Sequence, residues 1–321
     1  MHLALKNQLI MLECNIKFSI TIPAYKPNFL RECVDSILAQ SYSNFELVIV
    51  NDASPYDLDS IIGSYQDSRI RYYKNEKGCG ALHVVENWNK CLELTEGDYV
   101  ICMGDDDKLL PNCLMDYYQL IQKYPDVELF HSMTEIINEK SEVTDLQQPR
   151  PIRESVLSMI WWRWNGREQF IGDWLFKASS LKSRGGYTYF DFAWCSDDFS
   201  AIYAALEKGV VNTQTPGFQY RRNSLTITND VSNTNQKLAC RIKSLELYKE
   251  ILKVEPEGAL DSIYHKLLCD NLYKFHYRFI IGDLAVELRH NHFKILSWLF
   301  ERKQYQISLT VLLKAFYQSI R

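Results

Sequence analysis

FSITIPAYKPNFLRECVDSILAQSYSNFELVIVNDAS (residues 18–54) contains the signals of a strand, a helix and a second strand. FSITI (18–22) is β-rich, FLRECVDSILA (29–39) repeats its apolar residues at helical spacing, and FELVIV (45–50) is nearly all apolar, which is typical of a strand buried on both faces of a parallel sheet. This order predicts a doubly wound α/β sheet flanked by helices. The same alternation continues with predicted helices at 57–65, 81–94 and 110–124 and predicted strands at 69–74, 98–103 and 127–133.

Three polar turns follow predicted strands: PAYK (23–26), NDAS (51–54) and GDDDK (104–108). In open α/β sheets, ligands bind outside the carboxyl ends of the strands. We therefore expect these turns to meet at one edge of the sheet and to form the functional site.

The remainder of the chain is organised differently. A polar segment at 135–151 predicts a loop, and a basic, hydroxyl-rich segment at 219–230 predicts a loop or a strand. From about residue 236, helical patterns run to the end. We expect an N-terminal extension over 1–16, a main domain over 17–235 and a C-terminal helical subdomain over 236–321.

Composition excludes several classes of protein. Hydrophobic residues make up 46% of the 321 residues and charged residues 24%, which indicates a globular chain. The net charge of −4 argues against nucleic-acid binding. No stretch reaches the roughly 18 apolar residues of a membrane-spanning helix, and the N-terminus lacks the basic start of a signal peptide. The nine cysteines form no closely spaced pair of zinc ligands, which favours reduced thiols in a cytoplasmic protein.

Charge is unevenly distributed along the chain. Residues 261–321 hold nine Lys or Arg and five Asp or Glu, so this part carries +4 and the rest carries −8. Two interpretations stay open: a helical subdomain packed on the core, or a basic amphipathic surface that contacts an anionic membrane.

Acidic residues mark two candidate sites. Asp105, Asp106 and Asp107 follow an apolar strand, and a divalent cation, which prefers carboxylate oxygens, would offset their repulsion. The alternative is an acidic turn that caps the next helix. Asp197 and Asp198 begin a predicted helix, where they could stabilise its N-terminus or supply a general base.

Other polar groups have two interpretations each. Asp52 with Ser54 could bind a base or a ribose, or form an Asx-type turn. Gly78 and Gly80 could let a ligand approach the backbone, but a dinucleotide fingerprint would require glycine in place of His83. Groups suited to phosphate oxygens, or to a solvated basic loop, are present at Arg221, Arg222, Asn223 and Ser224.

Together, residues 18–54, EGDYVICMGDDDKLLP (96–111) and SDDFSAIYAALEKG (196–209) resemble a family-2 glycosyltransferase with the GT-A fold. The resemblance covers roughly residues 17–225. It implies a mixed sheet, a nucleotide-binding half over 17–133 and an acceptor half over 134–235. It also implies a sugar-nucleotide donor, a divalent metal ion (Mn²⁺ or Mg²⁺) and an inverting transfer.

Carried over by position, the resemblance assigns roles to single residues. Asp198 would be the general base, with Asp197 in place of the usual Glu, and Asp106 or Asp107 would hold the metal. The donor would contact Pro23, Ala24, Tyr25, Asp52, Ser54, Gly78, Asn87, Asp105, Asp106, Arg221 and Arg222. Because aromatic faces stack on sugars, we expect the acceptor, or else simple core packing, at Trp162, Trp164, Trp174 and Trp194.

The sequence departs from the family pattern at a few positions. Ala53 stands where glycine is usual, Gly104 replaces the first Asp of the Asp-Ser-Asp-Asp motif, and Asn223 replaces a His. An Arg that is usual near the middle helix is absent around Val84–Glu86.

The predicted function is an inverting hexosyl- or N-acetylhexosaminyl-transferase. It would move a sugar, most simply from a UDP-sugar, to a saccharide or lipid-linked saccharide acceptor in surface polysaccharide or glycoconjugate synthesis. We expect a cytoplasmic protein with peripheral contact to the inner face of the membrane through the C-terminal helices. The departures motivate an alternative, a non-catalytic nucleotide-sugar-binding or scaffold protein with a degenerate site. A sugar nucleotidyltransferase is disfavoured because PAYKPNF (23–29) lacks the glycines of a phosphate loop.

Overall fold

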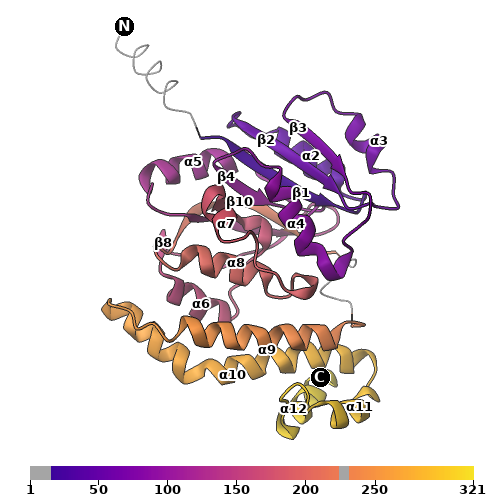
Figure 1. Cartoon of the computed structure of the whole chain (residues 1–321), viewed down its shortest axis with the longest axis vertical. Coiled ribbons are helices and arrows are strands. Elements are labelled where there is room, and N and C mark those ends of the chain that lie inside the picture. The colour runs from indigo at the N-terminus through magenta and orange to yellow at the C-terminus, as the bar shows by residue number, and fades with distance from the viewer. Residues whose placement is uncertain (1–15, 224–230) are drawn as a thin grey trace. The chain divides into compact units, whose positions relative to one another are not determined.

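The computed structural model describes residues 16–223 and 231–321, which fall into two compact units (Figure 1). The first unit holds the described residues up to Val156, with Glu168–Thr188 and Asp197–Arg222. The second holds Leu157–Arg167, Tyr189–Ser196 and the described residues from Asn223 to Arg321. The second unit therefore includes, from inside the expected main domain, these two short segments and the described residues between 223 and 235. The expected boundaries after residues 16, 133 and 235 stay a prediction.

A ten-stranded mixed sheet forms the centre of the first unit, with its main strands in the order β3-β2-β1-β4-β9-β6-β10-β5. The first four strands of this order run parallel to one another, β9 is antiparallel to both of its neighbours, and β7 and β8 pair with β6 and β10. The predicted doubly wound mixed sheet is confirmed. The strands are β1 (Phe18–Ala24), β2 (Phe45–Asn51), β3 (Ile70–Lys74), β4 (Tyr99–Cys102), β5 (Lys108–Leu109), β6 (Leu129–Ile137), β7 (Val143–Leu146), β8 (Arg153–Glu154), β9 (Trp174–Lys177) and β10 (Val210–Arg221).

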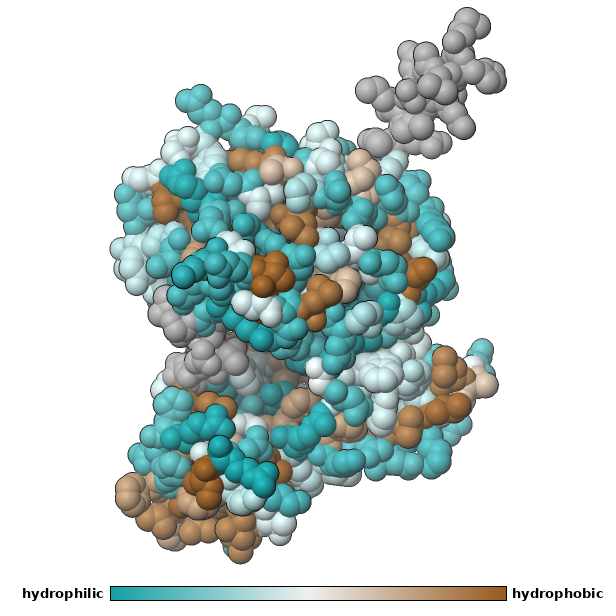
Figure 2. All heavy atoms as spheres, turned by 180° about the vertical axis from the view of Figure 1, so that it is seen from behind, coloured by the Kyte–Doolittle hydropathy of each residue, from teal (hydrophilic) through white to brown (hydrophobic). Residues whose placement is uncertain are grey.

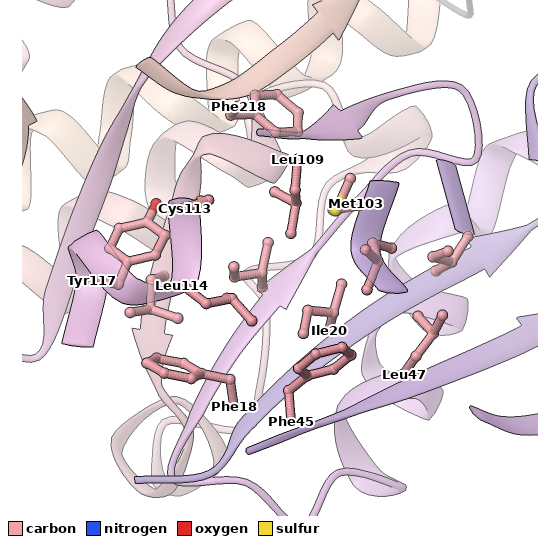
Figure 3. Close-up of a cluster of buried hydrophobic side chains, with 14 of the residues drawn as sticks. Phe18, Ile20, Phe45, Leu47, Met103, Leu109, Cys113, Leu114, Tyr117 and Phe218 are labelled. Carbon is pink, nitrogen blue, oxygen red and sulfur yellow. The ribbon is translucent and has the colours of Figure 1, made fainter. Parts of the chain in front are cut away.

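Helices cover both faces of this sheet. Leu47 and Ile49 of β2 face one cluster of buried apolar side chains, to which α2 and α5 contribute (Figure 3), whereas Val48 and Val50 face another, to which α4 contributes Cys91. The apolar run at 45–50 is therefore buried on both faces, as predicted. The helices of this unit are α2 (Leu30–Leu38), α3 (Leu58–Gly63), α4 (Val84–Glu93), α5 (Cys113–Lys123), α7 (Ala178–Ser183) and α8 (Ser196–Ala205, apart from its first residue).

The polar segment at 135–151 is not the loop that its composition predicts. β6 continues to Ile137 and β7 pairs with it in antiparallel fashion, with Glu135 opposite Leu146. The prediction was wrong because β7 is exposed along its whole length, so its residues carry no apolar alternation. The basic segment beginning at residue 219 is the end of β10, and residues 224–230 lie outside the described part of the chain.

Asp173 is a fully buried carboxylate immediately before β9. Its Oδ2 accepts hydrogen bonds from Gln147 (3.1 Å), Thr134 (3.2 Å) and the backbone N–H of Phe170 (3.1 Å), and it lies 3.3 Å from Nε2 of His131. These contacts fasten the segment before β9 to the sheet.

Burial raises the pKa of Asp173 to about 7, although nearby Arg150 opposes the rise. Ionisation therefore costs more in the folded state than in the unfolded chain. We expect the free energy of unfolding to fall as pH rises from about 4 through 7, by a few kcal/mol in total. Asp173→Asn should flatten this slope in urea unfolding curves recorded at pH 5 and pH 8. The exposed control Asp145→Asn should keep it, and an unchanged slope in Asp173→Asn would contradict the assignment.

The second unit is helical. It contains α6 (Val156–Trp164, apart from its first residue), α9 (Thr234–Ile251), α10 (Ala259–His290), α11 (Lys294–Glu301) and α12 (Leu309–Ser319). α10, α11 and α12 enclose a core that includes Leu284, Trp298 and Leu312. None of the helices in the described ranges is long and apolar enough to cross a membrane.

The cysteines that the structure describes are thiols. All eight in the described part of the chain are free, and six of them are buried. The ninth, Cys14, lies outside the described residues.

Candidate active site

The carboxyl ends of β1 and β4 form the switch point of the sheet, because the chain winds outward from β1 to β3 and then returns to the other side of β1 as β4. Ligands of open α/β sheets bind at such points. Asp105, in the turn after β4, accepts hydrogen bonds of 2.7 Å at Oδ2 from the backbone N–H groups of Tyr25 and of Lys26, which follow β1. The turns at 23–26 and 104–108 therefore meet, as predicted.

The acidic turn concentrates negative charge in a partly buried place. Withdrawal of water raises the pKa of Asp105 to about 6, although the two backbone hydrogen bonds lower it. Asp107 is buried, and burial together with the charge of Asp106 raises its pKa well above the usual range. A cation bound here would offset both effects.

Gly104 leaves open a point on which two of these carboxylates converge. A Cβ at this position would lie 2.8 Å from Oδ1 of Asp106 and 2.9 Å from Oδ2 of Asp107. Magnesium-like ions take one or two carboxylates and complete their shell with water and substrate phosphates, so these residues fit such an ion. Within the described ranges, no group of three or more His, Cys, Asp or Glu could hold an ion, and the metal stays a prediction.

Arg221 donates hydrogen bonds to the acidic turn. The side chain of Arg221 is fully buried, and its Nε donates to the backbone oxygen of Asp106 (2.8 Å). The backbone N–H of Arg221 donates to Oδ1 of Asp107 (2.9 Å). The remaining guanidinium nitrogens donate to the backbone oxygen of Asn138 and to Glu32, both at 3.0 Å. Contact with a diphosphate, as predicted for Arg221, would require these bonds to break.

Asp52 fastens the glycine turn to the end of β2. Its Oδ1 accepts from the backbone N–H of Cys79 (2.8 Å) and the side chain of Asn75 (2.9 Å), and its Oδ2 accepts from the N–H of Gly80 (3.0 Å). Asn87 is buried and accepts from Asn75 (3.1 Å), so it belongs to the same network. The turn around Gly78 therefore lies beside the polar turn at 51–54.

Gly78 is required by a close approach of two backbones. A Cβ at this position would lie 2.6 Å from the backbone oxygen of Asp52, a distance that real contacts do not show. Gly78→Ala should therefore lower the free energy of unfolding by about 1–3 kcal/mol and weaken nucleotide binding by displacing Asp52. At Gly63 a Cβ would meet nothing within 4 Å, so Gly63→Ala is the matched control. Equal melting temperatures for the two variants would contradict this account.

Two exposed tyrosines border the site. Pro23 and Ala24 complete β1, and the ring of Tyr25 after them meets the ring of Tyr56 edge to face at a centroid distance of 6.4 Å. Ser54 Oγ donates to the backbone oxygen of Tyr25 (2.6 Å) and joins the two turns. The two tyrosines are 44% and 53% exposed, so a flat ligand can reach them. Sequence reasoning missed Tyr56, whose only signal is its place in the turn after β2.

The predicted base lies on the first turn of α8. Asp198 is buried, and its Oδ1 accepts a hydrogen bond of 2.7 Å from Nε2 of Gln169. Asp197, next to it, is half-buried. Sequence reasoning missed Gln169, because nothing in the aromatic stretch around it indicates a partner for a residue 29 positions away.

An aromatic stack joins two residues that neighbour, in the chain, partners of Asp198 and of the acidic turn. The ring of Phe170, next to Gln169 in the chain, stacks on Tyr220 with a centroid distance of 3.7 Å and an interplanar angle of 11°. Burial raises the pKa of Tyr220, and the charges of Asp107, Asp106 and Asp197 raise it further. The acidic turn and Asp197 therefore both lie within electrostatic reach of the Tyr220 phenol.

Arg222 is half-exposed and is the accessible arginine of the predicted pair. Its Nη2 donates to both carboxylate oxygens of Glu168, at 2.7 and 2.9 Å. Asn223 belongs to the second unit, and Ser224 lies outside the described residues.

The predicted acceptor tryptophans differ in exposure. Trp174 of the first unit and Trp164 of the second are fully buried, so they are core residues and offer no face to a sugar. Trp164 packs against Tyr248 and Phe275, whereas Trp162 is 44% exposed. Trp194 is half-buried, and Nζ of Lys237 lies over its ring, 4.4 Å from the ring centroid.

The sheet, with its acidic turn at the switch point, is a GT-A fold. S. aureus TarS in complex with UDP matches it with a TM-score of 0.60 at 14% identity, over 95% of this chain and 89% of that one. The complex of S. aureus TarS with UDP-GlcNAc matches with a TM-score of 0.60 at 15% identity, over 95% and 88%.

A family model described as glycosyl transferase family 2 matches residues 19–185. The chain belongs to this family. An uncharacterised glycosyltransferase of Rickettsia typhi is 33% identical over 125 residues, which is 38% of each chain. Glycosyltransferase GlyG of Streptococcus pneumoniae is 31% identical over 108 residues, which is 33% of this chain and 35% of that one. The matched segment thus spans well under half of these relatives.

The structure shows the local geometry at two positions that depart from the family pattern. Ala53, in place of glycine, keeps the positive φ of 50° that favours glycine. Gly104, in place of aspartate, leaves room for the oxygens of Asp106 and Asp107.

Proposed function

We propose that this chain transfers a sugar from a UDP-sugar to a hydroxyl of a saccharide or lipid-linked saccharide, with inversion at the anomeric carbon. The observation that supports this most is the place of Asp198. It is buried and held by Gln169, and the residue after Gln169, Phe170, stacks on Tyr220, which precedes the Arg221 that binds the acidic turn. A base and a nucleotide site so placed suit a transfer reaction.

Asp198 would act as the general base. Its carboxylate would take the proton of the acceptor hydroxyl while that oxygen attacks the anomeric carbon from the face opposite the leaving nucleotide. The hydrogen bond from Gln169 orients the carboxylate of Asp198 through its Oδ1. Asp197 would add negative charge near the forming oxocarbenium-like centre.

The leaving UDP would be bound by the three polar turns. Asp52 and its turn would meet the uracil, with Tyr25 or Tyr56 against the ring, and Asp105 would lie near the ribose. Asp106 and Asp107 would hold a divalent ion, which supplies positive charge next to the diphosphate. Arg222 would approach the diphosphate from the accessible side. Arg221 would be a positioning residue for the acidic turn, since its guanidinium is already bound.

The donor class is supported by the two TarS complexes, which hold UDP and UDP-GlcNAc. Three further proposals rest on the family resemblance. They are the acceptor class, a hexosyl or N-acetylhexosaminyl group as the transferred sugar, and a role in polysaccharide synthesis in the cytoplasm.

The direct test is UDP release from a panel of UDP-hexoses and UDP-N-acetylhexosamines, with Mn²⁺ and a mixture of saccharide acceptors. We expect release from one donor above the rest, including slow hydrolysis without acceptor. Tight UDP binding with no release from any donor would favour the degenerate, non-catalytic alternative and contradict the proposal.

A further inference from the structure

The helices α11 and α12 expose a second apolar face besides the one that they bury. Phe293, Leu296 and Phe300 recur at helical spacing and are 83%, 58% and 85% exposed. On α12, Leu313, Tyr317 and Ile320 are 53%, 54% and 58% exposed. We call these six residues the apolar face.

The apolar face is not the inner side of either helix. Trp298 of α11 and Val311, Leu312 and Ala315 of α12 are buried in the core of the second unit. Figure 2 shows apolar side chains gathered at the α11–α12 end of this unit. Soluble domains rarely expose so many large apolar side chains together, so such a face marks an interaction surface.

The charges around the apolar face identify its partner. Residues 291–321 hold five basic side chains (Lys294, Arg302, Lys303, Lys314 and Arg321) and one acidic side chain, Glu301. Residues 261–290 hold four of each. The whole positive excess of the C-terminal part is therefore on the segment that carries the apolar face.

We infer that the apolar face of α11 and α12 binds an anionic lipid surface. Phe293 and Phe300 would insert among the acyl chains near the headgroups, and Lys303, Lys314 and Arg321 would lie at the headgroup level. The ring of Tyr317 already packs under the guanidinium of Arg321, 4.5 Å from the ring centroid, as an amphipathic pair at a membrane interface would. A second copy of this chain fits less well, since it would bring two basic clusters together.

Another exposed apolar group in the same unit provides a matched control. Val254, Leu260 and Ile263 are 73%, 65% and 58% exposed, but residues 249–263 hold four acidic and two basic side chains. Because its setting is net acidic, this equally exposed apolar group should not bind anionic lipid.

The experiment is flotation of the full chain with vesicles of phosphatidylcholine alone or with about 30% phosphatidylglycerol. Each basic residue near an anionic surface strengthens binding about fivefold, so we expect at least tenfold tighter binding to the anionic vesicles. Raising salt from about 0.1 M to 0.5 M should remove most of this preference.

Variants separate the two contributions. Phe293→Ser with Phe300→Ser should weaken binding to anionic vesicles at least tenfold. Lys303→Glu with Lys314→Glu should remove the preference for anionic vesicles, and Val254→Ser with Leu260→Ser should change binding less than twofold. All substituted side chains are exposed, and circular dichroism checks the fold.

Three results would overturn the inference: no vesicle binding, binding indifferent to lipid charge and salt, or equal loss in the control variant. A dimer in sedimentation velocity that the Phe variant dissociates would assign the apolar face to a second copy instead. None of these readouts depends on sugar transfer, so failure here and failure of the proposed function are distinguishable.

Discussion

Asp198→Asn is expected to lower the rate of sugar transfer by about 10²–10⁴-fold while leaving the affinity for UDP within about twofold. The amide keeps the size of the carboxylate and can still accept from Gln169, but it cannot take a proton from the acceptor hydroxyl. UDP should still bind, because the nucleotide is expected at the turns after β1, β2 and β4. The measurements are UDP release with saturating acceptor and calorimetric titration of UDP.

Gln169 provides the companion variants. Gln169→Leu removes the hydrogen bond that orients the carboxylate of Asp198, so transfer should fall about tenfold or more. Gln169→Asn, which keeps the amide on a shorter side chain, should recover part of the rate. If Asp198→Asn loses UDP binding as much as transfer, the base assignment fails.

Asp106→Ala is expected to remove the metal dependence of UDP binding. In wild type, Mn²⁺ should strengthen binding of UDP on the order of tenfold or more, because an ion held by Asp106 and Asp107 would also contact the diphosphate. In the variant this gain should be absent, and transfer should fall on the order of 10²-fold. Titrations of UDP with Mn²⁺ and with a chelator measure the gain in affinity. UDP release measures the rate of transfer.

The control for this variant is Asp145→Ala, an exposed aspartate on β7 of the same unit. It should keep the metal dependence and the melting temperature. A full Mn²⁺ effect in Asp106→Ala would contradict the metal assignment and leave the acidic turn with a structural role.

The sheet could be predicted from sequence because its strands are nearly continuous apolar runs. FELVIV is buried on both faces of the sheet as β2, and the turn GDDDK meets the backbone after β1. β7 could not be predicted, since a fully exposed edge strand carries no periodic signal.

Side-chain roles were harder to predict than the turns that carry them. Arg221 looks like a phosphate ligand by composition, but it is buried, and its four hydrogen bonds form because the end of β10 meets the acidic turn, the residue after β6 and α2 in three dimensions. Trp164 and Trp174 look like sugar platforms, and only their burial shows that they pack in cores. Gln169 has no sequence signal at all, because its contact with Asp198 depends on tertiary structure.

The most direct test of the central claim, a metal-assisted UDP site at the switch point, is the melting temperature with UDP, GDP, CDP or dTDP, with and without Mn²⁺. A ligand at 100 times its dissociation constant stabilises by about 2.7 kcal/mol, which is roughly 5–10 °C for a domain near this size. The account predicts this shift for UDP with Mn²⁺, a smaller shift without the ion, and only the smaller shift, with or without Mn²⁺, in Asp106→Ala. No shift with any of the four nucleotides, or an equal shift with all of them, would contradict it.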